Sequence, residues 1–164
     1  MTRQAFGTYS LMVTVVLWGV LLGGVVYSHI VFFPVYLSDL PASSAVVNGP
    51  YALNEARFWL TIHPLLLLSL IVSIVANWRN RERRRLITAT FAVYFVILVI
   101  TSLYFVPELL SFAGSTDSSA PVSEWHARAD RWQYLSWLRG ATLFVFSIPL
   151  LLALVRREKK DEDS

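Results

Sequence analysis

Four long apolar stretches, separated by polar segments, dominate the pattern of the chain. They cover approximately residues 9–37, 58–78, 86–107 and 132–155. A helix of about 20 apolar residues is long enough to cross the ~30 Å hydrocarbon core of a bilayer, and lipid does not tolerate open backbone. The pattern therefore predicts an all-α integral membrane protein in which residues 1–164 form a single four-helix bundle, with a frayed polar tail at 156–164.

The positive charges predict the orientation of these helices. Arginine and lysine are concentrated in the loop after the second stretch and in the tail, at Arg79, Arg81, Arg83, Arg84, Arg85, Arg156, Arg157, Lys159 and Lys160. Because such loops stay in the cytoplasm, both termini are expected there, and residues 38–57 and 108–131 on the opposite side. Residues 124–131 are typical of a short amphipathic helix at the interface, and Pro34 is expected to bend the first helix.

Composition narrows the classes of function. The chain is 55% hydrophobic and 15% charged, which is too apolar for an ordinary soluble domain. Its net charge of +3 comes from clusters beside apolar stretches, so it indicates topology rather than a nucleic-acid partner. Without cysteine there are no disulfides or thiolate-bound metals, and any metal needs histidine and carboxylate ligands. The lipid bilayer is the predicted partner, and assembly into an oligomer or a membrane complex stays open.

Ionisable residues at the ends of the apolar stretches are expected at one depth. The predicted topology places His29, His63 and His126 near the non-cytoplasmic boundary, together with Glu108 and Arg139. A charge at membrane depth costs about 3 kcal/mol or more, and such residues usually face the bundle interior with a partner. These five residues are therefore the candidates for a functional site.

The third apolar stretch carries a polar residue at every seventh position. Tyr94, Thr101 and Glu108 would share one face of a regular helix, and this face is expected to point into the bundle. Arg139 lies about two turns inside the fourth stretch, on the same side of the membrane. We therefore expect Glu108 to meet Arg139 across the bundle.

Two histidines and a carboxylate on different helices are typical of a metal site. His29, His63 and Glu108 form such a set, which suits a divalent iron, zinc, manganese or copper ion. Haem held by the two histidines ranks lower because nothing else marks a porphyrin slot. In this interpretation Arg139 orients a substrate, and His126 is an acid–base group or a further ligand. The alternative is structural: the same residues satisfy one another through hydrogen bonds and ion pairs.

Aromatic side chains near the same boundary supply candidate walls for a substrate pocket. Trp59 lies one turn before His63, where Pro64 is expected to open space beside the imidazole. The other candidates for a pocket that takes a hydrophobic small molecule are Tyr27, Tyr104 and Trp132. Aromatic residues at this depth also form the interfacial belts of membrane proteins, so both interpretations stand.

Several short motifs lie at the same boundary. They are Tyr27-Ser28-His29 with Pro34, Phe58-Trp59 with Ile62-His63-Pro64, Tyr104-Phe105-Val106-Pro107-Glu108, and Trp132 with Leu138-Arg139. Over nearly the whole chain, this arrangement resembles the anthrone-oxygenase-like family of small four-helix bacterial membrane proteins. The resemblance implies a protein of the bacterial inner membrane that oxidises a hydrophobic phenolic or polycyclic substrate at the periplasmic side.

Two hypotheses of function follow. In the first, the chain is a membrane-embedded, metal-dependent oxidoreductase that acts on a hydrophobic substrate. In the second, it is a non-enzymatic membrane subunit or small-ligand-binding protein, and its histidines, Glu108 and Arg139 are structural. A transporter ranks third, because the ionisable residues gather at one end and no polar path continues to the other.

Overall fold

The computed structural model describes residues 2–117 and 119–156, and within these ranges it contains helices and no strand. The first long helical stretch comprises α1 (Arg3–Tyr27), the π-helical turn η1 (Ser28–Phe32) and α2 (Phe33–Tyr36), and the second is α3 (Ala56–Ala76). The third comprises α4 (Arg81–Ile100), the π-helical turn η3 (Thr101–Phe105) and α5 (Val106–Ala113). The fourth comprises α6 (Val122–Val145) and α7 (Ser147–Val155), and the 3₁₀ turns η2 (Ala42–Val46) and η4 (Ser115–Asp117) lie in the connections.

All four helical stretches are long and apolar enough to cross a membrane, which confirms the predicted number of spans. The third ends at Ala113 rather than near residue 107, and the fourth begins at Val122 rather than near residue 132. The separate interfacial helix predicted at 124–131 is therefore wrong: this segment is the first part of α6. Its buried face packs on α5, where Trp125 contacts Phe112 edge to face, so it extends the bundle. The predicted frayed tail lies outside the described residues from 157 onward.

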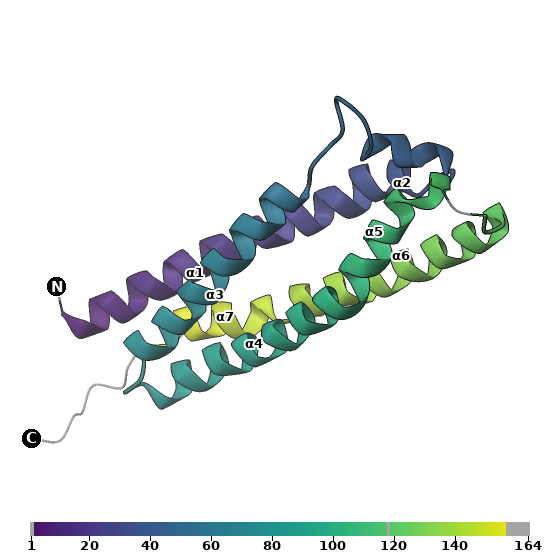
Figure 1. The fold of residues 1–164 in the computed structure, drawn as a ribbon. Coiled ribbons are helices and arrows are strands. Elements are labelled where there is room, and N and C mark those ends of the chain that lie inside the picture. Colours follow the sequence, from purple (N-terminus) through teal and green to yellow (C-terminus); the bar gives the residue numbers. More distant parts are fainter. Residues whose placement is uncertain (1, 118, 157–164) are drawn as a thin grey trace, which may run out of the picture.

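The four stretches run side by side, with α1 packed mainly on α3 and α4 on α7 (Figure 1). Thr2 and Arg156, the first and last described residues, lie at the same end of the bundle, where Arg83 bonds to Thr8 and to the Arg156 carbonyl. We call this the arginine-rich end, defined by residues 77–85. The opposite end, defined by residues 37–55 and 113–121, is the loop end.

The outward faces of the helices are apolar. Side chains such as Leu60, Leu68 and Leu103 are more than half exposed, and only 22–28% of the most apolar part of each span is buried. A helix that is hydrophobic on all sides is typical of a membrane span or of the interior of a large protein. The bundle therefore needs an apolar surrounding that it does not itself supply.

Two separate apolar cores fill the interior. The first core lies toward the arginine-rich end and includes Leu11, Trp18, Leu21, Val25, Leu66, Leu70, Ile87, Tyr94, Ile97, Leu143 and Leu150. The second core lies toward the loop end and includes Phe32, Phe33, Tyr36, Leu40, Phe105, Phe112, Trp125, Ala129 and Trp132. On three of the four spans, the residues between the two cores include polar side chains.

The two π-helical turns coincide with this boundary. In each, a residue beginning the turn accepts a bond from the backbone N–H five residues later: Phe33 bonds to the Ser28 carbonyl, and Val106 to the Thr101 carbonyl. Each turn starts six residues before a proline, Pro34 or Pro107. Proline lacks the N–H and its ring clashes with the carbonyl four residues earlier, and the wider turn accommodates both defects. The expected bend at Pro34 is thus a π-helical turn.

Candidate functional site

The side chain of Arg139 lies between the two cores, on α6. One guanidinium nitrogen, Nη1, donates to the Thr101 hydroxyl at 3.1 Å, and Nη2 donates to the Ser136 hydroxyl at 3.0 Å. The guanidinium also lies over the ring of Phe105, 4.1 Å from its centroid. These contacts hold the cation inside the bundle, instead of letting it extend along the helix toward an aqueous surface.

His29 continues this set of hydrogen bonds from the π-helical turn η1. Its Nδ1 lies 2.7 Å from the Val25 carbonyl, and its Nε2 lies 3.0 Å from the Ser136 hydroxyl. Because a carbonyl only accepts, Nδ1 carries a proton and donates. Ser136 accepts from Arg139, and its own proton is therefore available for Nε2 of a neutral His29. We call His29, Thr101, Ser136 and Arg139 the polar layer.

His63 is bonded elsewhere. Its Nδ1 lies 2.6 Å from the hydroxyl of Tyr94, which is buried in the first core and also meets Trp18 edge to face. The indole of Trp59 stacks on the imidazole with 5.5 Å between ring centroids. His63 therefore shares no hydrogen bond with the polar layer.

Glu108 does not meet Arg139, and this expectation was wrong. Its two carboxylate oxygens accept from Nε and Nη2 of Arg128, each at 2.8 Å, and Nη2 also donates to Ser111. The cause is η3, which adds one residue to the turn. The inward face passes through Tyr94 and Ile97 and continues at Phe105 instead of following a strict seven-residue repeat, so Glu108 does not lie on it. Its partner Arg128 lies near the start of α6, eleven residues before Arg139 on the same helix.

Glu55 is a partly buried carboxylate that sequence reasoning did not single out. Both of its oxygens accept from the Ser28 hydroxyl, at 2.9 and 3.1 Å, and one accepts from the Trp59 indole at 3.4 Å. Burial raises the pKa of Glu55 above its ordinary value, and the bonds from Ser28 and Trp59 oppose this rise. The only hint in the sequence is its position, one turn before Trp59 at the start of a span.

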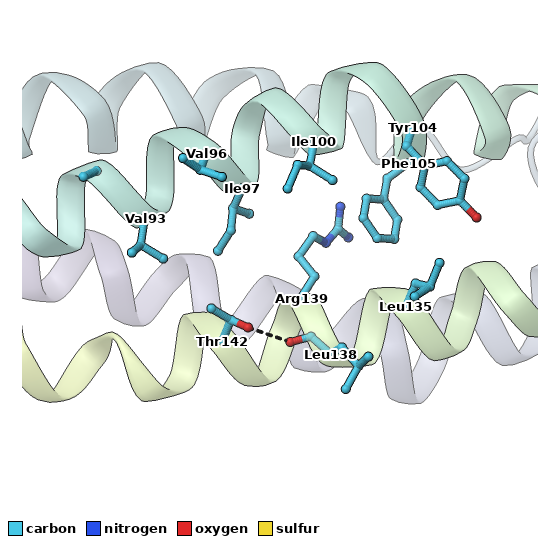
Figure 2. Close-up of a pocket in the computed structure, with 11 residues that line it drawn as sticks. Val93, Val96, Ile97, Ile100, Tyr104, Phe105, Leu135, Leu138, Arg139 and Thr142 are labelled. Atoms are coloured by element: carbon cyan, nitrogen blue, oxygen red, sulfur yellow. Dashed lines mark hydrogen bonds between the residues drawn. The ribbon is translucent and has the colours of Figure 1, made fainter.

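A cavity of about 560 Å³ opens beside Arg139, between α4, η3 and α6 (Figure 2). Its walls are Ala92, Val93, Val96, Ile97, Ile100, Tyr104, Phe105, Leu135, Leu138, Arg139 and Thr142. Figure 2 shows the Arg139 side chain reaching from α6 toward α4, with the guanidinium between Ile100 and Phe105. Arg139 is the one charged residue of this lining, and no carboxylate in the described part of the chain lies within 4 Å of it.

Comparison with known proteins identifies no family for this chain. Neither family models, curated proteins nor solved structures match this chain. The resemblance to the anthrone-oxygenase-like family therefore stays a prediction.

The predicted metal ligands lie in three separate groups of contacts. His29 bonds to Val25 and Ser136, His63 to Tyr94, and Glu108 to Arg128. Within residues 2–117 and 119–156 there is no cluster of three or more histidine or carboxylate side chains that could hold a metal ion. The proposed ligand set is not brought together here, because the π-helical turn directs Glu108 away from the polar layer.

The remaining predicted residues are divided between the cavity and the core. Tyr104 lines the cavity beside Arg139, whereas Trp132 is buried in the second core, where its indole donates to the Phe105 carbonyl at 2.9 Å. Trp59 and Tyr27 are not part of the lining; Trp59 contacts His63, and Tyr27 is half exposed. His126 is partly buried near the start of α6, and its Nε2 has no hydrogen-bond partner among the described residues.

Proposed function

We propose that this chain is a multi-pass membrane protein that binds an amphipathic molecule with an anionic head group in the cavity beside Arg139. The arginine-rich end would lie in the cytoplasm of a bacterial cell, and the cavity would open sideways into the bilayer. The observation that carries the proposal is an arginine inside a span, at an apolar cavity, with no carboxylate partner in the described chain.

The hydrogen bonds of Arg139 leave capacity for a ligand. A guanidinium has five N–H donors, and Thr101 and Ser136 each accept one of them. Two neutral hydroxyls do not neutralise the charge, and an unpaired charge in hydrocarbon is unfavourable by about 3 kcal/mol or more. A carboxylate or phosphate would supply the missing charge and two acceptor oxygens in a geometry that matches the guanidinium.

The rest of the cavity suits an apolar tail. Its volume of about 560 Å³ falls within the usual range of roughly 300–1,000 Å³ for small-molecule sites. Val93, Val96 and Ile97 line it on the α4 side, so a tail lying along them would meet only hydrocarbon. Val96 and Leu138 are about half exposed on the surface of the bundle, which supports entry from the side of the helices.

Ligand binding is better supported than the oxidoreductase hypothesis. The metal-dependent hypothesis needs several histidine or carboxylate ligands close together, and the described residues supply no group of three such ligands. Binding requires only the charge and the cavity, both of which the residues provide. The metal-dependent activity implied by the resemblance stays an untested prediction.

Binding by the purified protein in a neutral detergent tests the proposal. We expect palmitate and lysophosphatidate to raise the melting temperature and to be retained in native mass spectra, whereas hexadecanol, which has a similar tail without the charge, is not retained. The comparison of palmitate with lysophosphatidate distinguishes a carboxylate from a phosphate head. Tight binding of a neutral quinone with none of either anion would overturn the assignment of an anionic ligand.

Variants separate the head site from the tail site. Arg139→Gln should weaken binding of the anion at least about tenfold, because a charge-assisted hydrogen bond contributes about 1.5–3 kcal/mol. Val96→Trp should block the cavity, whereas Val99→Trp places the same ring on the same helix outside the lining and should leave binding unchanged. Equal effects of the two tryptophan variants, or wild-type affinity of Arg139→Gln, would contradict the proposal.

A further inference from the structure

A second, smaller cavity lies at the arginine-rich end and plays no part in the site around Arg139. Its volume is about 230 Å³. Its walls come from the first turns of α1, the end of α3, the connection to α4 and the first turn of α4, and they are Gln4, Gly7, Ala76, Asn77, Arg79, Asn80 and Arg83. Polar side chains make up most of this lining, in contrast to the cavity beside Arg139.

Arg83 is the buried charge of this cavity, with an exposed fraction of 7%. Its Nε donates to the Arg156 carbonyl at 2.7 Å, and Nη1 donates to the hydroxyl of Thr8 and the amide oxygen of Asn77. Nη2 has no hydrogen-bond partner in the described part of the chain. Every acceptor around this guanidinium is neutral, and no described carboxylate lies within 4 Å of it.

The nearby acidic residue is engaged with another arginine. Glu82 pairs with Arg156 at 3.5 Å, and both side chains are well exposed. The amide oxygen of Asn80 accepts from the backbone N–H of Arg83 and caps α4. Arg79 makes no hydrogen bond or ion pair with the described residues and adds a second positive charge to the cavity wall. The groups left for a ligand are therefore mainly N–H donors on cations.

We propose that this cavity binds the phosphate of an anionic phospholipid from the leaflet at the arginine-rich end. A phosphate brings the negative charge and the several acceptor oxygens that Arg83 and Arg79 lack. The source is a lipid rather than a free ion because the cavity lies where the apolar spans end. Val75, one turn before Arg79, is 60% exposed, and Trp78 is 57% exposed, as expected at the level of head groups and acyl chains.

The test measures lipid binding by the full chain in a neutral detergent. Phosphatidylglycerol should bind and raise the melting temperature, phosphatidylcholine should not, and inorganic phosphate should compete only at concentrations at least a hundredfold higher. Arg79→Gln and Arg83→Gln should each weaken binding of phosphatidylglycerol about fivefold or more. Arg85→Gln removes the same charge from an exposed position of α4 outside the cavity and should change the affinity less than twofold.

Arg79→Gln keeps the test decisive if Arg83→Gln does not fold, because Arg79 makes no bond with the described fold. An equal loss of affinity in Arg85→Gln and Arg79→Gln would assign the effect to the general positive field and overturn the site. Binding of inorganic phosphate as tight as that of the lipid would overturn the lipid assignment. Because neither outcome involves Arg139, the proposed function stands or falls separately.

Discussion

Ser136 is a small side chain on which two larger polar groups depend. It accepts from Arg139 and lies within bonding distance of His29 Nε2, so a single hydroxyl joins α6 to the π-helical turn of the first span. Ser136 is fully buried, so water cannot take over the hydrogen bonds of its hydroxyl without a change in packing. The spacing of residues along the fourth apolar stretch places Ser136 on the same face as Arg139, but it does not predict the hydrogen bond that Ser136 shares with His29.

We expect Ser136→Ala to destabilise the bundle by about 1–3 kcal/mol, because it leaves a buried imidazole nitrogen and a guanidinium donor without a partner. Ser102→Ala is the matched control, since Ser102 is exposed on η3 and makes no side-chain hydrogen bond with the described residues. Unfolding in a denaturing detergent, followed by circular dichroism, measures both. Equal stability of the two variants would show that the hydroxyl is not required.

Glu55 predicts a pH dependence of stability. Burial raises its pKa in the folded chain, so ionisation is less favourable there than in the unfolded chain. Its contribution is fully present below the ordinary value of 4.5 and is lost as the pH rises through the raised pKa of the folded state. The melting temperature of the wild type relative to Glu55→Gln should therefore fall as the pH rises from 4 to 8.

Ser28→Ala provides an internal check on that result. The Ser28 hydroxyl donates to the Glu55 carboxylate and favours its charged form, so its removal should raise the pKa further. The fall in stability should then begin at the same pH as in the wild type and extend to a higher pH. A difference between wild type and Glu55→Gln that stays constant with pH would contradict the assigned shift.

At the scale of elements, the π-helical turns explain which predictions succeeded. Runs of apolar residues predicted the four spans because length and hydrophobicity decide whether a helix can cross a bilayer. A regular helical repeat could not predict which side chains after Thr101 point into the bundle. One extra residue in a turn rotates all later residues of the helix by about 100°. The available signal was a proline inside the apolar stretch, at Pro34 and Pro107, which a regular α-helix does not accommodate.

The same scale gives a prediction about the contact between α1 and α3. A Cβ added at Gly24 would come within 2.7 Å of the Phe58 ring and 3.3 Å of Trp59, whereas one added at Gly23 meets nothing within 4 Å. We expect Gly24→Ala to destabilise the bundle by about 1–3 kcal/mol, as overpacking does, and Gly23→Ala to be neutral. Melting temperatures of the two variants test this, and similar values would mean that α1 and α3 are not so close.

For the whole molecule, the absence of cysteine makes orientation directly measurable. Ala42 is exposed at the loop end, and Gln4 is exposed at the arginine-rich end. We expect a cysteine at position 42 to react with a membrane-impermeant maleimide on intact cells, and one at position 4 to react only after permeabilisation. The reverse pattern would invert the proposed topology, and labelling of both in intact cells would argue against a sealed membrane location.

The sequence predicted the overall architecture more completely than it predicted the contacts of the site. The bundle follows from composition and periodicity, which are averages over many residues and tolerate local errors. The partners of Arg139, Glu108 and His63 depend on single turns and single hydroxyls, where an offset of one residue changes the contact. Arg128 illustrates this: it was placed in a separate interfacial helix, and it forms the bidentate pair with Glu108.

The division of the interior into two cores has a consequence for local opening. The polar layer interrupts apolar contact between them, so the loop end can separate its second core without exposing the first. Amide hydrogens of α2 and α5 would then exchange with solvent sooner than those of α1 and α4, as expected for regions that open as separate units. If the proposed ligand binds beside Arg139, such opening would let it enter or leave the cavity while the other half of the bundle stays folded.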